Sequence, residues 1–318
     1  MNGFESAFHF DSLVWDWIIA IYLFLAGMSA GAVMITVYLK RKVIVGDPAQ
    51  NGIMKAMAWL APFGIISGLT ILIFHLTKPL EFWKIMIFYN PTSVMSMGVI
   101  LFQVYMAVLF VWIGIIFQKT IVDFLGDKLT FVDGLLAWFK RFENSIELFL
   151  AFLALVLAAY TGFLLSALKT YPMLNNPVLP LLFLFSSLSS GAAACLMFGI
   201  LVFKESVKDP SVSWVHGFER PVVLFELFVL VTFFTGLIFA GGQAEMAAWN
   251  AISGGFWAQW FWVGVVLIGM LLPLTLNWLV PAEVRHKHAY IFVVTTLSMV
   301  GVLMLRTFIL YAGQMTVV

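Results

Sequence analysis

The chain has 318 residues, of which 63% are hydrophobic and only 10% are charged, and its formal net charge is +1. Soluble globular proteins average about 45–50% apolar and about 25% charged residues, so the composition excludes an ordinary soluble domain. A net charge this close to zero also argues against nucleic acid as a partner. The sequence therefore predicts a polytopic membrane protein.

Eight long apolar runs follow one another along the chain. Each approaches the roughly 20 residues that cross a bilayer as an α-helix. We expect an all-α protein with transmembrane helices at residues 15–39, 54–76, 94–118, 144–168, 178–203, 221–244, 257–280 and 289–313. An even number of crossings places both termini on the same side of the membrane.

The gaps between these runs are alternately rich and poor in Lys and Arg. Thirteen of the seventeen Lys and Arg residues lie in every second gap: Lys40, Arg41, Lys42, Lys55, Lys119, Lys128, Lys140, Arg141, Lys204, Lys208, Arg220, Arg285 and Lys287. Short loops rich in Lys and Arg stay in the cytoplasm. The basic side is therefore predicted to be cytoplasmic, and both termini are predicted to face outward.

The N-terminal residues before the first run do not look like a cleavable signal. They contain Glu5, Asp11 and Asp16 and no Lys or Arg, whereas a signal peptide begins with basic residues. We therefore expect the first helix to remain as a membrane anchor.

Cysteine and histidine usage bears on redox cofactors. Cys195 is the single cysteine, which cannot supply an iron–sulfur cluster or covalently attached haem. The histidines are His9, His75, His216, His286 and His288. No two of them are expected to face each other at the middle of the membrane, as a haem of the cytochrome b type requires. We expect no metal in this chain, so any electrons come from another subunit or a diffusible carrier.

A weak internal repeat relates the first and fifth helices. The first contains FLAGMSAGAVMI (24–35) and the fifth contains FSSLSSGAAACLM (185–197), and small residues at this spacing let helix backbones approach in lipid. Two four-helix bundles, residues 1–170 and 171–318, follow as a hypothesis. The alternative is that unrelated membrane helices share such runs by chance.

Ionisable residues within the apolar runs are candidate functional groups. A charge at the bilayer centre costs roughly 2.5–3.5 kcal/mol on insertion scales, so such residues often mark a pathway or a site. Glu147, Glu226 and Arg306 lie inside predicted helices, and Glu219 precedes the sixth. The alternatives are that Glu147 reaches the cytoplasmic interface and that Glu226 pairs with a neighbouring cation.

A second group of candidates lies near the predicted outer face. Tyr22 and Tyr160 lie deeper than the interfacial aromatic belt requires, and His75 ends the second helix. A buried phenol needs a hydrogen-bond partner, which a quinone carbonyl would provide. An imidazole exchanges a proton near neutral pH. These residues are typical of a quinone site with two phenols and a proton-transfer group.

Three motifs in this region resemble the NrfD/PsrC family. They are W-x6-Y-x4-G-x3-G (Trp15, Tyr22, Gly27, Gly31), HLTKP (75–79) and SVMSMG (93–98). The usual second motif is HLGRP or DLGRP, so Thr77 and Lys78 replace its Gly and Arg. The resemblance spans essentially the whole chain. The length and the set Tyr22, Tyr160, Glu226 and Arg306 look most like the polysulfide reductase membrane subunits of this family.

The resemblance implies a quinol-oxidising subunit of the bacterial cytoplasmic membrane, with eight helices in two bundles and periplasmic termini. A ferredoxin-like subunit with [4Fe–4S] clusters would dock on the outer face, followed by a molybdopterin catalytic subunit that reduces polysulfide or sulfur. Menaquinol would bind in the first bundle. By motif, Tyr22, His75 and Tyr160 would contact it, with His75 and Tyr160 also catalytic, and Glu219, Glu226 and Arg306 would move protons through the second bundle.

A secondary transporter or proton channel is the alternative function. Internal repeats, a central Arg306, and the helix prolines Pro62 and Pro273 fit transporters with broken helices. Against it, no pair of charged mid-helix residues occupies corresponding positions in the two halves. Genes for an iron–sulfur and a molybdopterin protein beside this one would favour the redox function.

Overall fold

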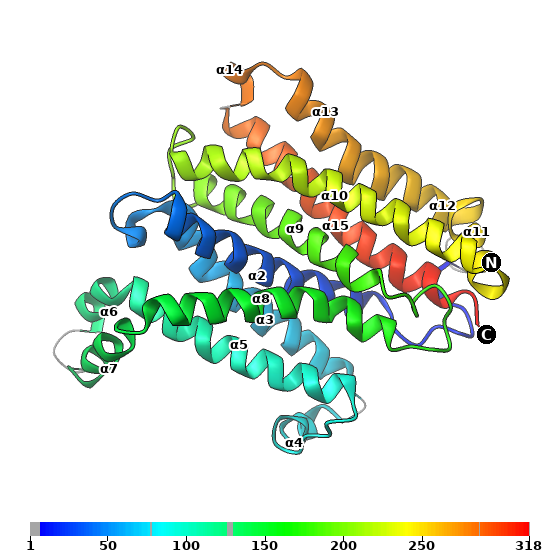
Figure 1. Cartoon of the computed structure of the whole chain (residues 1–318), viewed down its shortest axis with the longest axis horizontal. Coiled ribbons are helices and arrows are strands. Elements are labelled where there is room, and N and C mark those ends of the chain that lie inside the picture. Colours follow the sequence, from blue (N-terminus) through cyan, green and yellow to red (C-terminus); the bar gives the residue numbers. More distant parts are fainter. Residues whose placement is uncertain (1–6, 77, 126–129, 286, 318) are drawn as a thin grey trace.

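A computed structural model describes residues 7–76, 78–125, 130–285 and 287–317. Within these residues the protein is helical without strands, and eight helices are long and apolar enough to cross a membrane. They are α2 (Trp17–Lys42), α3 (Gly52–His75), α5 (Val94–Ile116), α8 (Glu143–Ser166), α9 (Leu179–Leu201), α10 (Pro210–Ala240), the segment Gly255–Leu279 and α15 (His288–Gln314). The predicted all-α, multi-pass membrane fold is confirmed (Figure 1).

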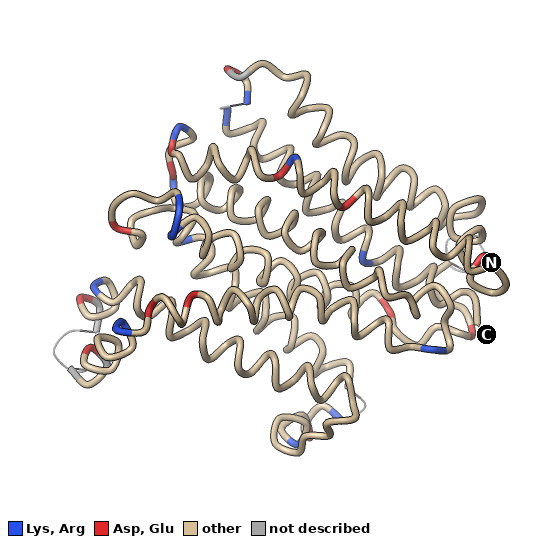
Figure 2. Tube along the Cα trace, viewed as in Figure 1, with Lys and Arg blue, Asp and Glu red and all other residues tan. Residues whose placement is uncertain are grey.

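Both chain ends lie at the same end of the bundle (Figure 1), as an even number of crossings requires. Figure 2 shows that most Lys and Arg residues gather at the opposite end. The assignment of that basic end to the cytoplasm remains a prediction from the positive-inside rule. We refer below to the end that carries the termini as the terminal end.

Helix α10 begins at Pro210, which is well before the predicted start at residue 221. The Asp209 carboxylate accepts a hydrogen bond from the Ser211 backbone N–H, 2.8 Å away, and Pro210 fits the first turn because its missing N–H has no partner there. Glu219 therefore lies within this helix rather than before it. The helix ends at Gly241, whose φ of 68° suits glycine.

The seventh crossing consists of three stretches: α12 (Gly255–Gln259), a π-helix labelled η4 (Trp260–Leu271), and α13 (Leu272–Leu279). A π-helix of this length is unusual. Within it, Gly269 faces Gly301 of α15 so closely that a Cβ on either residue would overlap the other backbone. Apolar periodicity predicted this crossing but not its π-helical geometry.

Short elements outside the eight crossings were not predicted. They are the 3-10 helices η1 (Pro48–Gln50) and η2 (Pro79–Glu81), and the helices α4 (Phe82–Ile87), α6 (Gln118–Leu125), α7 (Thr130–Lys140), α11 (Gly242–Ile252) and α14 (Ala282–Arg285). Helix α7 exposes the large apolar side chains of Phe131, Leu135 and Trp138. Such a face is typical of a helix that lies in the membrane interface.

Helices α2 and α9 pack against each other at the centre of the bundle (Figure 1). A Cβ added at Gly31 would overlap the Ser187 carbonyl group, and one added at Gly191 would overlap the backbone of Ala32. The small-residue runs of the first and fifth helices thus face each other, since only small residues permit this approach. Helices α3, α5 and α8 pack around one side of this pair, and α10, η4 and α15 around the other. The division at residue 170 stays a proposal.

The segment before α2 is tied to the C-terminal end of α15. The Gln314 side-chain oxygen accepts hydrogen bonds from the backbone N–H groups of Val14 and Trp15, each at 2.9 Å. The Trp17 N–H donates to the Tyr311 hydroxyl at 2.8 Å. These bonds satisfy backbone donors that have no partner at a helix N-terminus. They place Trp15 and the start of α2 precisely enough to form one wall of a cavity at the terminal end.

Candidate functional site

Tyr22, His75 and Tyr160 line one cavity of about 210 Å³ at the terminal end of the bundle. They come from α2, α3 and α8, and α5 contributes Phe102 to the same wall. The other lining residues are mostly apolar: Val14, Trp15, Ile19, Leu69, Leu72, Leu76, Met95, Val99 and Leu164. We call this space the quinol cavity, after the ligand predicted for it. The structure thus brings together the three residues that were predicted as quinone ligands; their roles remain a prediction.

Two polar groups in the quinol cavity are available to a ligand. The Tyr22 side chain is 3% exposed, and its hydroxyl makes no hydrogen bond to any residue that the structure describes. His75 is the last residue of α3, and its imidazole likewise has no hydrogen-bond partner among the described residues. His75 is exposed whereas Tyr22 is buried. The cavity can therefore offer a deep phenol and a shallow imidazole to one ligand.

Tyr160 is already hydrogen-bonded within the protein. Its hydroxyl donates to the Val94 carbonyl oxygen, 3.1 Å away, at the start of α5. A Cβ at Gly98 would overlap the phenol, so the glycine is what lets the ring reach α5. The Phe102 ring packs edge-on against Tyr160 with centroids 6.2 Å apart. In this arrangement the Tyr160 oxygen can accept a hydrogen bond but has no proton to donate.

Arg306 is completely buried and joins three helices. Its Nη1 donates to Thr161 Oγ1 at 3.2 Å, and its Nη2 donates to Ser186 Oγ at 2.8 Å and Ser187 Oγ at 3.0 Å. Nη2 also donates to the Phe183 carbonyl oxygen at 3.0 Å. A planar guanidinium can make several such bonds at once. Sequence reasoning selected Arg306 but missed its partners, because serine and threonine are common in membrane helices.

Glu219 and Glu226 lie on one face of α10, seven residues apart, which is about 10 Å along a helix. The Glu219 Oε1 accepts a hydrogen bond from Ser298 of α15 at 2.8 Å, and its Oε2 lies 3.8 Å from His216 Nδ1. Glu226 is 2% exposed and interacts electrostatically with Arg306.

Several buried polar atoms along this face of α10 and at Arg306 have no hydrogen-bond partner among the residues described. They are both ring nitrogens of His216, Glu219 Oε2, Glu226 Oε1 and Arg306 Nε. Buried groups of this kind normally bind ordered water. His216, half-buried one turn before Glu219, lies inside α10, whereas the predicted start of this helix at residue 221 left it outside.

Glu147 has a structural explanation. Its carboxylate, only 1% exposed, is ion-paired with Lys40 of α2 and accepts a hydrogen bond from Trp112 Nε1 of α5 at 3.2 Å. Arg41 lies 3.9 Å from its other oxygen. A buried carboxylate must be paired to remain charged. Glu147 therefore ties three helices together near the basic end of the bundle.

The described residues contain no group of three or more His, Cys, Asp or Glu side chains close enough to hold a metal ion. His286 lies outside those residues, as does Thr77 of the HLTKP motif. Trp15, the first residue of the first motif, lines the quinol cavity although it was not predicted as a ligand.

The chain matches a known protein family over nearly its whole length. Residues 5–318 match the family model "Polysulphide reductase, NrfD". The chain is 47% identical to Protein NrfD homolog of Haemophilus influenzae, covering 98% of this chain and 97% of that protein. It is 46% identical to Protein NrfD of Escherichia coli, covering 98% of each. It is 40% identical to the C subunit of polysulfide reductase from Wolinella succinogenes, covering 96% of each. The chain belongs to the NrfD family of membrane proteins.

Proposed function

We propose that this protein is the quinol-oxidising membrane subunit of an oxidoreductase complex in the bacterial cytoplasmic membrane. The observation that carries the proposal is the convergence of Tyr22, His75 and Tyr160 on one apolar cavity. The similarity to the C subunit of polysulfide reductase supports a role as one subunit of a reductase. Menaquinol is the proposed ligand, and on oxidation it supplies two electrons and two protons.

The cavity residues fit the hydroxyl groups of a quinol. The Tyr160 hydroxyl donates its hydrogen bond to the Val94 carbonyl oxygen, so its own oxygen is left to accept a hydrogen bond from one quinol hydroxyl. Tyr22 can bind the ring oxygens at depth, because its hydroxyl has no partner among the described residues. A neutral imidazole accepts a proton near neutral pH, and His75 is exposed, so it can pass that proton to the aqueous side. These roles make Tyr160 and His75 the proposed catalytic residues.

The proposed partners follow from the family. A ferredoxin-like subunit with [4Fe–4S] clusters would bind at the terminal end and receive the electrons, and a molybdopterin subunit beyond it would reduce polysulfide or sulfur. The proposal of this acceptor rests on the similarity to the polysulfide reductase C subunit. Neither haem nor an iron–sulfur cluster is proposed in this chain, which has a single cysteine.

Residues 1–170 would form the quinone-binding bundle, and residues 171–318 a second bundle that conducts protons. Glu219, Glu226 and Arg306 are the proposed proton pathway. Their placement along α10 and α15 supports this role, as do the buried polar atoms of all three that have no hydrogen-bond partner among the described residues. Proton conduction would couple quinol oxidation to the proton gradient.

Purification of the native protein in mild detergent, followed by mass spectrometry and assay, tests the proposed function. We expect iron–sulfur and molybdopterin subunits in stoichiometric amounts, and menaquinol oxidation with polysulfide preferred over other acceptors. Tyr22→Phe should lower this activity without loss of the partners, whereas Tyr38→Phe at the other end of α2 should not. Isolation of the chain alone, with transport activity in vesicles, would favour the transporter or channel instead.

A further inference from the structure

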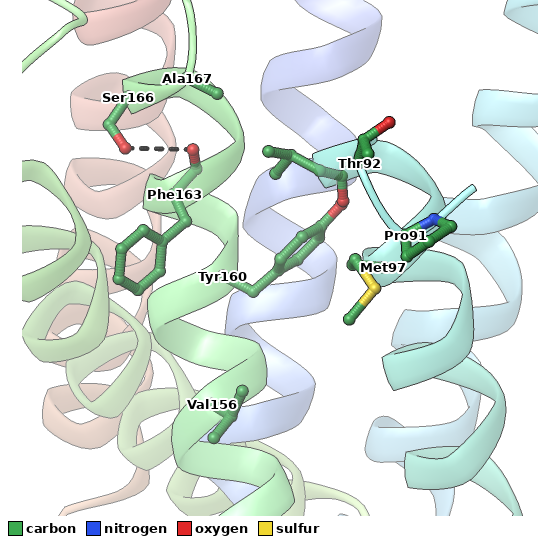
Figure 3. Close-up of a pocket in the computed structure, with 9 residues that line it drawn as sticks. Pro91, Thr92, Met97, Val156, Tyr160, Phe163, Ser166 and Ala167 are labelled. Carbon is green, nitrogen blue, oxygen red and sulfur yellow. Dashed lines mark hydrogen bonds between the residues drawn. The ribbon is translucent and has the colours of Figure 1, made fainter. Parts of the chain in front are cut away.

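A second cavity, of about 410 Å³, lies beside the quinol cavity between α5 and α8. It is lined by Pro91, Thr92, Val94, Met97, Val156, Tyr160, Phe163, Ser166 and Ala167. We call it the α5–α8 vestibule. Tyr160 lines both spaces. Figure 3 shows its ring reaching from α8 toward Pro91, Thr92 and Met97 of the vestibule.

The vestibule opens to the surface of membrane-spanning helices. Met97 of α5 is 49% exposed and Phe163 of α8 is 55% exposed. Both helices cross the membrane, so side chains exposed on them at this depth face lipid. Val156 of α8 and Ala167, the residue directly after this helix, are eleven residues apart, which is about 16 Å along the helix axis. The vestibule therefore extends along the membrane normal.

Every hydroxyl on the vestibule wall already donates its hydrogen bond within the protein. Thr92 Oγ1 donates to Asn90 Oδ1 at 2.7 Å, Ser166 Oγ to the Phe163 carbonyl at 3.1 Å, and Tyr160 to the Val94 carbonyl at 3.1 Å. The remaining lining side chains are apolar. A ligand of this space is therefore a hydrocarbon chain, in contrast to the quinol cavity with its Tyr22 hydroxyl and His75 imidazole.

The size of the quinol cavity requires a second space for a long ligand. Pockets that enclose a drug-sized molecule measure roughly 300–1,000 Å³. The quinol cavity, at about 210 Å³, is smaller and suits the ring system of a quinol without its tail. The tail must therefore leave the quinol cavity between two helices. The vestibule is an apolar space that shares Tyr160 with the quinol cavity.

We propose that the α5–α8 vestibule holds the first part of the polyprenyl tail of the quinol whose ring lies in the quinol cavity. This inference rests on the proposed function. Its occupant is the tail rather than the acyl chain of a phospholipid, because the vestibule adjoins the quinol cavity at the shared Tyr160 ring. Lipid is as apolar as the vestibule, so moving the tail from lipid into the vestibule contributes little free energy. The vestibule instead fixes the direction of the tail and its position relative to the ring.

Photolabelling of the purified native complex tests where the tail lies. The probe is a menaquinone analogue with a diazirine on its second isoprene unit. We expect labelling of Met97, Val156 or Phe163 that excess unlabelled menaquinone prevents. Labelling that menaquinone prevents but that falls on another surface, such as Phe74 of α3, would overturn the tail site and leave the proposed function intact. Labelling that neither menaquinone nor Tyr22→Phe reduces would indicate lipid-like binding and overturn both.

A steric variant provides an independent test. Val156→Trp should fill the vestibule and lower kcat/KM for menaquinol at least tenfold while leaving that for the tailless 2-methyl-naphthoquinol within twofold. Leu155→Trp is the matched control, since Leu155 is 46% exposed and lines neither cavity. Equal loss for both quinols, or no loss for either, would contradict the inference. If the complex with Val156→Trp does not assemble, Met97→Phe replaces it. Met97 is an exposed residue of the same wall, and kcat/KM for the two quinols is compared in the same way.

Discussion

The guanidinium carbon of Arg306 lies 3.7 Å from the ring centroid of Phe183, and the same side chain donates a hydrogen bond to the Phe183 carbonyl oxygen. One residue of α9 therefore contacts the arginine through both its ring and its backbone. A cation over an aromatic ring is favourable by about 2 kcal/mol or more when desolvated. Arg306 thus has a clear structural role, which is compatible with a role in proton movement and must be separated from it by experiment.

Replacing Arg306 with Lys separates the charge from the geometry. Lysine keeps the positive charge but cannot reproduce the planar fork that reaches Thr161, Ser186 and Ser187. A lost hydrogen bond to a charged group costs about 1.5–3 kcal/mol, so we expect a clearly lower thermal unfolding midpoint in detergent. Arg41→Lys, at a more exposed site, is the control. An unchanged midpoint would mean that the hydrogen bonds of Arg306 contribute nothing to stability.

Tyr160→Phe removes the hydroxyl that we expect to accept a hydrogen bond from quinol. A single neutral hydrogen bond contributes about 1–1.5 kcal/mol, so quinol oxidation should fall roughly tenfold while the complex still assembles. Steady-state kinetics with menaquinol measures this. Unchanged turnover would remove Tyr160 from the site.

Gly98→Ala should reproduce that loss with Tyr160 intact. The added methyl would occupy the position of the phenol, so the ring must turn away from Val94. Gly236→Ala on α10 is the control, because no atom lies within 4 Å of the added Cβ. The same kinetic assay applies to both. Normal activity of the Gly98 variant would show that the Tyr160 position is not critical for quinol oxidation.

Gly31→Ala should destabilise the centre of the bundle. The new Cβ would overlap the Ser187 carbonyl, which is backbone and cannot rotate aside. Overpacking typically costs about 1–3 kcal/mol, so α2 and α9 should separate at a lower denaturant concentration. Gly217→Ala, where the added methyl meets open space, should unfold at the wild-type concentration. Equal stability of the two variants would refute the close approach of α2 and α9.

Glu226→Gln tests the proposed proton pathway. Glutamine keeps the shape of the side chain but cannot ionise, so quinol oxidation in detergent should stay near the wild-type rate. Proton uptake from the basic side by the complex in vesicles should fall severalfold. Glu245→Gln on α11 is the control outside the proposed pathway. Proton uptake equal to that of the wild type would exclude Glu226 from the pathway.

Hydropathy alone was sufficient to predict the eight crossings, because each apolar run matches the thickness of a bilayer. The exception is the start of α10. Its first three turns contain His216 and Glu219, which are polar in sequence but half-buried or buried in the structure, where Glu219 accepts a hydrogen bond from Ser298. A tertiary contact of this kind overrides the polarity of a short segment, and a single sequence does not reveal it.

The convergence of Tyr22, His75 and Tyr160 on one cavity was also predictable in part, since all three were placed near the same predicted outer face. The bond from Tyr160 to Val94 was not, because it depends on the room left by Gly98. The vestibule was missed for a similar reason. Apolar side chains that line a cavity and apolar side chains that simply face lipid look alike in sequence.

The hydrogen bonds between the N-terminal segment and Gln314 and Tyr311 bear on biosynthesis. The first helix leaves the ribosome long before the last one, yet its partners Gly191 and Gln314 are synthesised near the middle and the end of the chain. Its glycine face must therefore be covered by lipid or by the insertion machinery until α9 and α15 have been inserted. Helix α2 is made before α9 and α15 but reaches its final position only after both have been inserted. Completion of the quinol cavity therefore depends on translation through α15.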